Sequence, residues 1–322
     1  MDEQIDILMA TYNGEKYLKK QIDSILNQTY SNIRLIISDD SSTDRTREII
    51  KEYEKKDKRV YIYYQENNLG YIKNFEFLLT KVKSNIYMLS DQDDIWLPNK
   101  VENTYNFLQK QNADMVFTDL IVVDEKEEVI NKSFNNLMNL TKKINKTINS
   151  KEIVYLYNCV TGCTIMGISK LINKILPIPT NSKHVLHDHW IALVSSMNGK
   201  IAYLPEGTIK YRQHNNNQIG IKHATNKNTS IEKIREHFIE VKLGVFGTYI
   251  KNPEIFPENF KEKNNKVYKY FKMLEQKKKI NFKGWKVFHE LYKNESFKYY
   301  IENFLILNMP GFVKLILKKK GE

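Results

Sequence analysis

Short apolar runs alternate with amphipathic stretches along the first 123 residues of the chain. The runs are typical of buried strands, which carry apolar side chains on both faces, and they lie at residues 5–11, 33–38, 60–64, 86–90 and 113–123. Between them, apolar residues recur at the spacing of one helix face at residues 15–29, 45–56, 71–83 and 98–112. This alternation predicts an α/β fold with a mostly parallel central sheet flanked by helices.

The pattern changes after this alternating part. Residues 126–150 are polar and weakly periodic, which predicts a mobile insertion that acts as a lid. The later pattern predicts a short helix from residue 152, a strand at 159–166, a helix at 187–197 and short strands at 201–204 and 208–211. From residue 230 the pattern is helical to the end. We therefore expect an α/β domain over residues 1–228, with halves at 1–123 and 150–228, and a basic helical region over 229–322.

Positive charge is concentrated at the end of the chain. The net charge is +12, and residues 261–322 hold 16 lysines and six glutamates without arginine or aspartate, a net charge of +10. A nucleic-acid binder usually carries arginines across a folded face, so the nearly neutral remainder disfavours nucleic acid as a partner. Lysines interleaved with aromatic residues suit an anionic membrane surface. The alternative is a helical cap with a solvated basic face.

The cysteines and the chain start restrict the class of protein. Cys159 and Cys163 are the only cysteines, too few for a disulfide framework or for a four-thiolate zinc site. Residues 1–4 lack the basic start and apolar core of a signal peptide, and no run of 18 apolar residues occurs. We therefore expect a cytoplasmic protein that is peripheral at the inner face of the cell membrane.

Three carboxylates follow the apolar run 86–90: Asp91, Asp93 and Asp94, called the acidic cluster below. Carboxylates crowded at a strand end repel one another and lose hydration, so the arrangement is costly without a counter-charge. Mg²⁺ or Mn²⁺ would offset the charge, because hard cations bind carboxylate oxygens. The alternative is a solvated acidic turn in which Asp94 or Asn99 caps the next helix.

Polar loops follow the other predicted strands as well, at residues 11–14, 39–44 and 67–70. Because ligands of open α/β sheets bind beyond the carboxyl ends of the strands, these loops and the acidic cluster are expected to line one crevice. Neither a G-x-G-x-x-G motif after the first strand nor a P-loop motif occurs. A diphosphate in this acidic crevice would need a metal ion between itself and the carboxylates.

Five groups of residues in this part closely resemble the motifs of glycosyltransferase family 2: Ala10–Gly14, Leu26–Tyr30, Ser38–Asp44, Asn68–Gly70 and Asp91–Trp96. Weaker matches continue to about residue 215 at Gly162–Cys163, Asp188–Trp190 and Tyr211–His214, and the region after residue 230 is not covered. The resemblance implies a GT-A fold and the use of a nucleotide-diphosphate sugar.

The resemblance also implies roles for single residues on the donor side. Thr11 and Tyr12 would wall the base, Glu15 would approach the nucleotide, and Asp40 would accept a hydrogen bond from a uracil or thymine ring. Asn68, Gly70 and Asp91 would bind the nucleotide sugar, with Asp91 at the ribose. Asp93 would ligate Mn²⁺ or Mg²⁺. His214 ends a strand that is expected to return toward the crevice, where it would touch the diphosphate or the metal, and Arg212 would bind phosphate as a bidentate fork. The alternative for both residues is a surface loop with ordinary polar side chains.

On the acceptor side, Asp188 would be the general base, because the family places an aspartate beside a tryptophan at a helix start. The alternative for Asp188 is a helix cap. Gly162 and Trp190 would lie on the acceptor side. His187 and His189 flank Asp188, and one of them is expected to pack or to bind water.

The resulting hypothesis is an inverting, metal-dependent glycosyltransferase. It would move a sugar from a UDP- or dTDP-sugar, with rhamnose as one candidate, to a saccharide or lipid-linked saccharide acceptor in capsule, O-antigen or other cell-surface polysaccharide synthesis. The rhamnose candidate comes from the forms at 91–96 and 212–214, which are similar to a rhamnosyltransferase-like subset. The alternatives are a sugar-phosphate nucleotidyltransferase and a non-catalytic metal- or nucleotide-binding module.

Overall fold

The computed structural model describes residues 3–138, 140–141, 144, 152–182, 184–214, 230–276, 282–292 and 297–309. The chain forms two compact units. The first comprises residues 1–178 and 186–221, and the second comprises residues 179–185 and 222–322. The predicted boundary after residue 228 lies in the stretch 215–229, outside the described residues. The short segment 179–185 belongs to the second unit, which the sequence pattern did not indicate.

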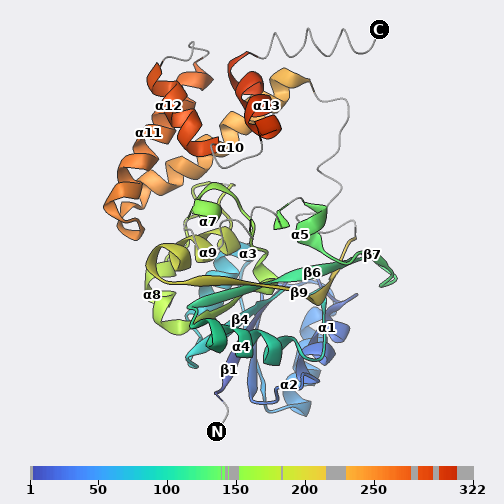
Figure 1. Ribbon diagram of the computed structural model, residues 1–322. Coiled ribbons are helices and arrows are strands. Elements are labelled where there is room, and N and C mark those ends of the chain that lie inside the picture. Colours follow the sequence, from blue (N-terminus) through green and yellow to red (C-terminus); the bar gives the residue numbers. More distant parts are fainter. Residues whose placement is uncertain are drawn as a thin grey trace, which may run out of the picture. The chain divides into compact units, whose positions relative to one another are not determined.

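A nine-stranded mixed sheet forms the centre of the first unit, in the order β3-β2-β1-β4-β8-β6-β9-β5 with β7 beside β6 (Figure 1). The strands are β1 (Ile5–Thr11), β2 (Ile33–Asp39), β3 (Val60–Tyr64), β4 (Ile86–Ser90), β5 (Ile95–Trp96), β6 (Met115–Val123), β7 (Val129–Asn131), β8 (Met166–Ile168) and β9 (Ile201–Arg212). Strands β1 to β4 are parallel. β8 is antiparallel to both β4 and β6, and β9 is parallel to β6, so β6 and β9 run in the direction of the first four. The predicted mostly parallel sheet is confirmed.

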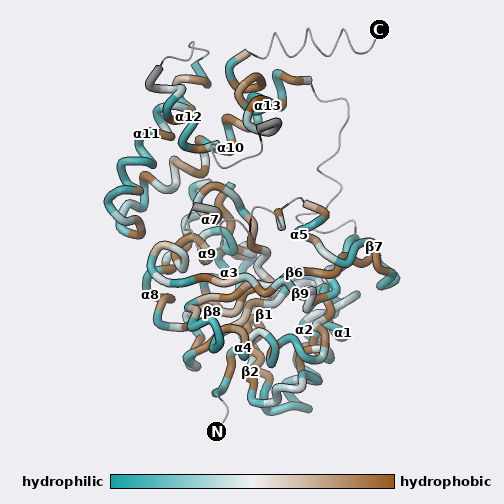
Figure 2. The backbone as a smooth tube through the Cα atoms, in the orientation of Figure 1, coloured by the Kyte–Doolittle hydropathy of each residue, from teal (hydrophilic) through white to brown (hydrophobic). Residues whose placement is uncertain are grey.

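Helices pack around this sheet. They are α1 (Leu18–Leu26), α2 (Thr46–Lys56), α3 (Tyr71–Leu79), α4 (Lys100–Gln111), α5 (Phe134–Leu137), α7 (Glu152–Leu156), α8 (Ile172–Ile175) and α9 (His187–Asn198), with short 3-10 helices η1 (Gly162–Thr164) and η2 (Ser169–Leu171). Every residue of β2 and β4 is buried, and so is most of β1, as expected for strands covered on both faces. Figure 2 shows the apolar centre of the sheet and the hydrophilic outer helix α2.

Two predictions about local structure in the first unit are wrong. Residues 159–166 are not a strand, because the Thr164 and Ile165 N–H groups donate to the Thr161 and Gly162 carbonyls and wind the chain into η1. Periodicity does not distinguish a short apolar turn from a short strand. Residues 201–212 form one strand, β9, with register shifts against β6, where two strands were expected. The insertion predicted at 126–150 contains β7 and α5, and its residues 139, 142–143 and 145–150 lie outside the described residues, so its role as a mobile lid stays a prediction.

The second unit is helical where it is described. Its elements are α10 (Ile231–Lys251), η4 (Pro253–Ile255), α11 (Glu258–Glu275), α12 (Phe282–Tyr292) and α13 (Phe297–Asn308). Buried aromatic side chains, among them Phe246, Phe271 and Phe288, form its core. The Arg235 guanidinium of α10 donates to the Leu274 and Leu307 carbonyls, both at 2.8 Å, which ties α10 to the ends of α11 and α13. None of the helices in the described residues is long and apolar enough to span a bilayer.

Candidate active site

The loops after β1 and β2 are joined by hydrogen bonds that run from main chain to side chain. The Asn13 and Gly14 N–H groups donate to the hydroxyls of Ser42 at 2.9 Å and Thr46 at 2.8 Å. Glu15 N–H donates to Asp44. In return, the Glu15 carboxylate accepts Arg45 N–H at 3.0 Å at the start of α2. The Glu15 carboxylate thus joins two loops. Its contact with a nucleotide stays a prediction.

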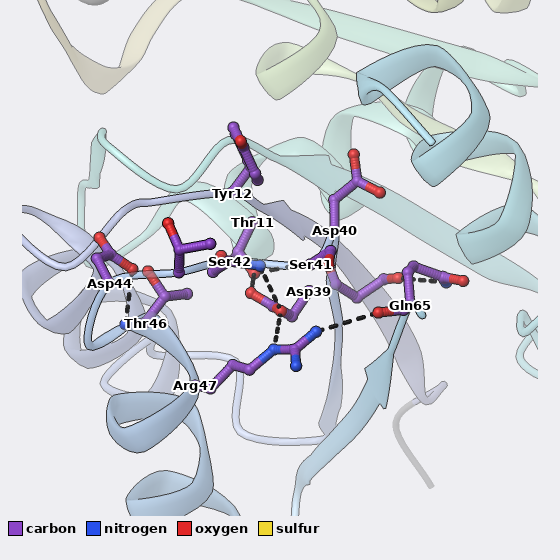
Figure 3. Close-up of polar contacts among 12 residues, drawn as sticks. Thr11, Tyr12, Asp39, Asp40, Ser41, Ser42, Asp44, Thr46, Arg47 and Gln65 are labelled. Atoms are coloured by element: carbon purple, nitrogen blue, oxygen red, sulfur yellow. Dashed lines mark hydrogen bonds and ion pairs between the residues drawn. The ribbon is translucent and has the colours of Figure 1, made fainter. Parts of the chain in front are cut away.

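The two adjacent aspartates after β2 face different surroundings, because successive side chains of an extended chain point to opposite faces. The buried Asp39 accepts the Arg47 guanidinium at 2.6 Å and Ser42 N–H at 3.1 Å. In Figure 3, Asp39 points toward Arg47, and Asp40 points away from it on the side of Tyr12. Asp39 is therefore neutralised within the fold, whereas Asp40, although only 2% exposed, faces the side of Tyr12 at the sheet edge.

The loop after β3 holds Asp40 in place. Leu69 and Gly70 N–H groups donate to the two Asp40 carboxylate oxygens at 2.7 and 2.9 Å. The Asn68 amide donates to the Asp40 carbonyl at 3.2 Å, and Gly70 has φ of +77°, a conformation that favours glycine. Asn68 and Gly70 therefore belong to the loop that fixes the position of the Asp40 side chain. Since a carboxylate offers about four lone-pair sites, Asp40 keeps the capacity to accept a further N–H donor.

Gln92, between the first two members of the acidic cluster, locks the loop after β1. Its side-chain amide accepts Tyr12 N–H at 2.9 Å and donates to the Tyr12 carbonyl at 3.0 Å. A Cβ at Gly14 would lie 2.3 Å from Gln92 Oε1, so only glycine fits beside the amide. Tyr12 is 47% exposed, whereas Thr11 is buried with its hydroxyl against Asp39. Tyr12 can therefore wall a base, whereas the Thr11 side chain is buried, and its predicted contact with the base stays a prediction.

Asp91 and Asp94 of the acidic cluster lie beside the buried thiol of Cys163, with one ligand atom from each within 4.8 Å of the others. Burial, and then the charges of Asp93 and Asp188, raise the pKa of Asp91 to about 7. Burial and the charges of Asp93 and Asp91 raise the pKa of Asp94 well above its usual range. The cluster therefore holds its negative charge at a cost, which is the condition for binding a cation.

The third member, Asp93, faces a different partner. His214 Nε2 lies 2.8 Å from Asp93 Oδ2, although 121 positions separate the two residues. The Asp93 side chain remains 20% exposed. The predicted metal contacts thus meet at the sheet edge, where the chain leaves β9.

The donor chemistry decides which group fits Mg²⁺ or Mn²⁺. A carboxylate oxygen with an imidazole nitrogen is a suitable set, so Asp93 and His214 fit. The group formed by Asp91, Asp94 and Cys163 fits these ions less well, because one of its three ligands is sulfur, a soft ligand, whereas Mg²⁺ and Mn²⁺ prefer oxygen.

Arg212 is buried and its guanidinium is used within the fold, which weighs against its predicted phosphate contact. The side chain is 2% exposed. Its guanidinium donates to the Asp93 carbonyl at 3.0 Å and the Glu125 carbonyl at 3.1 Å, and lies 4.8 Å from the Tyr17 ring centroid. Its main-chain N–H donates to Asp94 Oδ1 at 3.2 Å. Arg212 therefore fixes the turn that presents Asp93, and its fork is not open to an exposed phosphate.

Asp188 is buried at the start of α9, near enough to Asp91 for their charges to interact. It accepts His189 N–H at 2.6 Å and also the N–H of Gly162 and the amide of Asn158. Burial outweighs these hydrogen bonds and raises the pKa of Asp188 to about 6. A carboxylate with a pKa in this range is a competent general base near neutral pH.

The predicted acceptor residues have different surroundings. Gly162 lies against α9, where a Cβ would come within 2.9 Å of His187 Nε2 and 3.6 Å of Asp188 Cβ. Trp190 is 1% exposed, and its indole N–H donates to the Ile175 carbonyl at 2.7 Å. The Trp190 indole therefore anchors α9 to α8, and its place on the acceptor side stays a prediction.

Several contributing residues escaped sequence reasoning. Arg47 and Gln92 look like ordinary polar residues, and only their partners show that they neutralise Asp39 and lock Tyr12. Lys100 is buried with its ammonium 4.7 Å from the Trp96 ring centroid, and burial lowers its pKa to about 8 despite the attraction of Asp94. No sequence signal marks a lysine at the start of a helix as buried.

Comparison with known proteins agrees with this geometry. The family model for glycosyl transferase family 2 matches residues 6–176, more than half of the chain. The O-antigen biosynthesis glycosyltransferase WbnJ of Escherichia coli is 30% identical over 217 residues, which cover 66% of this chain and 81% of WbnJ.

Two solved structures share the fold. S. aureus TarS in complex with UDP-GlcNAc superposes with a TM-score of 0.57 at 17% identity and covers 84% of this chain and 72% of the TarS chain. The mannosyltransferase PcManGT from Pyrobaculum calidifontis, in complex with GDP-Man and Mn²⁺, has a TM-score of 0.57 at 12% identity and covers 96% of this chain and 82% of its own. With the family model and the WbnJ match, they lead to one conclusion: this chain belongs to glycosyltransferase family 2 and has its GT-A fold.

Proposed function

We propose that this protein is an inverting, metal-dependent glycosyltransferase that uses a nucleotide-diphosphate sugar in cell-surface polysaccharide synthesis. The observation that carries the proposal is the meeting of Asp93 with His214 at 2.8 Å on the sheet edge that also presents Asp40. The name of WbnJ supports a polysaccharide product, and the UDP-GlcNAc bound to TarS supports a nucleotide-sugar donor.

On the donor side, Asp40 would accept an N–H from a uracil or thymine ring while the loop at 68–70 holds it in place. The exposed Tyr12 ring would cover the base, and Asp91 would meet the ribose. Asp93 and His214 would hold Mn²⁺ or Mg²⁺, as the Mn²⁺ bound to PcManGT supports. When bound, such an ion neutralises charge that develops on the leaving diphosphate.

On the acceptor side, Asp188 would accept the proton of the attacking hydroxyl. Its buried position raises its basicity, and the N–H donors of Gly162 and His189 hold its orientation. A single displacement with this base would invert the anomeric centre. UDP- and dTDP-sugars, including a rhamnose donor, are the proposed donor class, and a saccharide or lipid-linked saccharide is the proposed acceptor class.

The second unit is proposed to bind an anionic membrane surface that carries a lipid-linked acceptor. Trp285 of α12 is 41% exposed and Ile301 of α13 is 37% exposed, which supports contact with lipid. The final lysine-rich stretch at 310–322 lies outside the described residues. Co-sedimentation with phosphatidylserine vesicles at low salt is expected, with loss in pure phosphatidylcholine or at high salt. Absence of binding at low salt would leave the unit a structural cap.

A donor-hydrolysis screen tests the enzymatic proposal. UDP-, dTDP- and GDP-sugars are incubated with the protein and Mn²⁺, and the released nucleoside diphosphate is measured. We expect release from a UDP- or dTDP-sugar that stops with EDTA, and a product anomer opposite to that of the donor by NMR. Binding of only nucleoside triphosphates would favour the nucleotidyltransferase alternative, and binding without turnover would favour the non-catalytic module.

A further inference from the structure

His187, the first residue of α9, is a buried imidazole that forms no hydrogen bond within the described residues. It is 7% exposed, and neither Nδ1 nor Nε2 has a partner. Its ring stacks on Phe75 with centroids 4.3 Å apart and planes at 11°, and meets the edge of Tyr71 at 5.9 Å. Buried polar atoms are almost always hydrogen-bonded, because desolvation without a partner is costly. Two unpaired nitrogens on one ring therefore indicate a missing partner.

The unpaired nitrogen lies beside the proposed base. A Cβ at Gly162 would stand 2.9 Å from His187 Nε2 and 3.6 Å from Asp188 Cβ. Gly162 N–H also donates to the Asp188 carboxylate. Position 162 has no room for a Cβ, so a larger residue there would displace the His187 ring from its place next to Asp188. His187 Nε2 and the base share this one neighbour.

The charge state of the ring selects the chemistry of the partner. Burial lowers the pKa of His187 to about 3, so the ring is neutral at any working pH. A neutral imidazole offers one N–H donor and one acceptor nitrogen. A hydroxyl complements it, since it donates and accepts, and an anion complements only the N–H.

We infer that His187 hydrogen-bonds a sugar hydroxyl at the reaction centre and that this hydroxyl belongs to the acceptor. The inference rests on the proposed function, because Asp188 at the next position is the base proposed for the acceptor. His187 is then a specificity residue that orients the acceptor while Asp188 takes its proton. The stacked ring of Phe75 holds the imidazole in a single orientation for this contact.

Kinetics of two variants test the inference. A reactive pair is first found for the wild type among UDP-GlcNAc, UDP-Glc, UDP-Gal and dTDP-rhamnose as donors and p-nitrophenyl glycosides as acceptors. His187→Phe keeps the stack and removes both nitrogens, so kcat/KM for the acceptor is expected to fall about 10-fold while the donor KM stays within about twofold. His187→Gln, which offers a donor and an acceptor, should recover part of the loss. An unchanged acceptor kcat/KM, or a shift confined to the donor KM, would overturn the inference.

Urea unfolding without ligand gives a second readout. Because His187 makes no hydrogen bond in the free protein, His187→Phe should leave the midpoint unchanged or raise it. The neighbouring buried His189 is a matched control: its Nε2 lies 3.1 Å from the Val154 carbonyl, so His189→Phe should lower the midpoint. A clear loss of stability in His187→Phe would mean that the ring is needed by the fold, against the inference. Absence of transfer by the wild type with every pair would contradict the proposed function. In that case the urea midpoints would still show whether the fold needs the His187 ring.

Discussion

Aspartates with little solvent exposure occupy two regions of the same sheet, and their surroundings are opposite. Asp6, near the start of β1, receives the Arg34 guanidinium at 2.9 and 2.6 Å, the Lys83 and Ser84 N–H groups and the Ser84 hydroxyl. Burial alone would raise the pKa of Asp6, but these donors outweigh it and lower the pKa. Asp91 and Asp94, at the carboxyl end of the neighbouring β4, have raised pKa values.

The difference separates a structural charge from a functional one. Asp6 has all the donors that a buried carboxylate requires, so its charge stabilises the fold. The acidic cluster has a backbone N–H, a thiol, one imidazole and the buried Lys100 as neighbours, and within the described residues no guanidinium neutralises Asp91 or Asp94 as Arg34 neutralises Asp6, so its charges remain available to a ligand. Strain of this kind concentrates at active sites, where an incoming partner relieves it. Four predictions test this contrast.

The largest effect is expected at Asp93. Asp93→Asn keeps the shape of the side chain and removes the charge that would hold the metal ion. Transfer should fall about 10³-fold or more, since the ion contributes several kcal/mol to the transition state. Mn²⁺ with UDP should raise the melting temperature of the wild type and not that of the variant. Near wild-type turnover in Asp93→Asn would show that Asp93 is not the metal ligand.

At the opposite end of the sheet, Asp6→Ala should change stability and not catalysis. It leaves the Arg34 guanidinium buried without its carboxylate, which is expected to cost about 3–5 kcal/mol in the free energy of unfolding. Urea titration measures this loss, and kcat of the folded fraction at low temperature should stay within about twofold of the wild type. If catalysis fell and stability did not, Asp6 would belong with the functional carboxylates.

A smaller catalytic effect is expected at Asp188. Asp188→Asn keeps a side-chain oxygen for the Gly162 and His189 N–H groups and removes the base, so kcat should fall about 10²-fold while the donor KM changes little. In the wild type, kcat/KM should fall as the pH drops below about 6, because the raised pKa protonates the base there. A variant with normal kcat would show that Asp188 only caps α9.

The smallest effect is a pH-dependent gain in stability for the same variant. The pKa of Asp188 is about 6 in the fold and 3.8 in the unfolded chain, so the wild type loses stability as the pH rises from about 4 to 6. The amide introduced by Asp188→Asn does not ionise, so the stability of the variant relative to the wild type should grow across this window by on the order of 2 kcal/mol. Urea unfolding midpoints at pH 4 and pH 7 in EDTA measure this gain. The same difference between variant and wild type at both pH values would contradict the raised pKa of Asp188.

The amino-acid sequence determined the alternating part of the fold. Apolar runs of strand length and amphipathic stretches of helix length place β1 to β4, α2 and α4 within a few residues, because local periodicity reports which faces are buried. The sequence also indicated the edge where Asp40 and Asp93 lie, since parallel strands end together. His214 could be placed near this edge as the end of a returning strand, but the sequence did not decide whether it touches the metal or the diphosphate.

Tertiary structure alone decided which of several chemically similar residues remain available to bind a ligand. Asp39 and Asp40 are identical neighbours in the sequence, yet Arg47 neutralises one, and backbone N–H groups at 69–70 hold the other at the edge. Arg212 looks like a phosphate fork, but its donors are used by carbonyls that come together only in the folded chain. Hydrogen bonds between residues far apart in the sequence decide such cases. A local pattern specifies the secondary structure and the buried face, and only the fold brings each polar group to its partner.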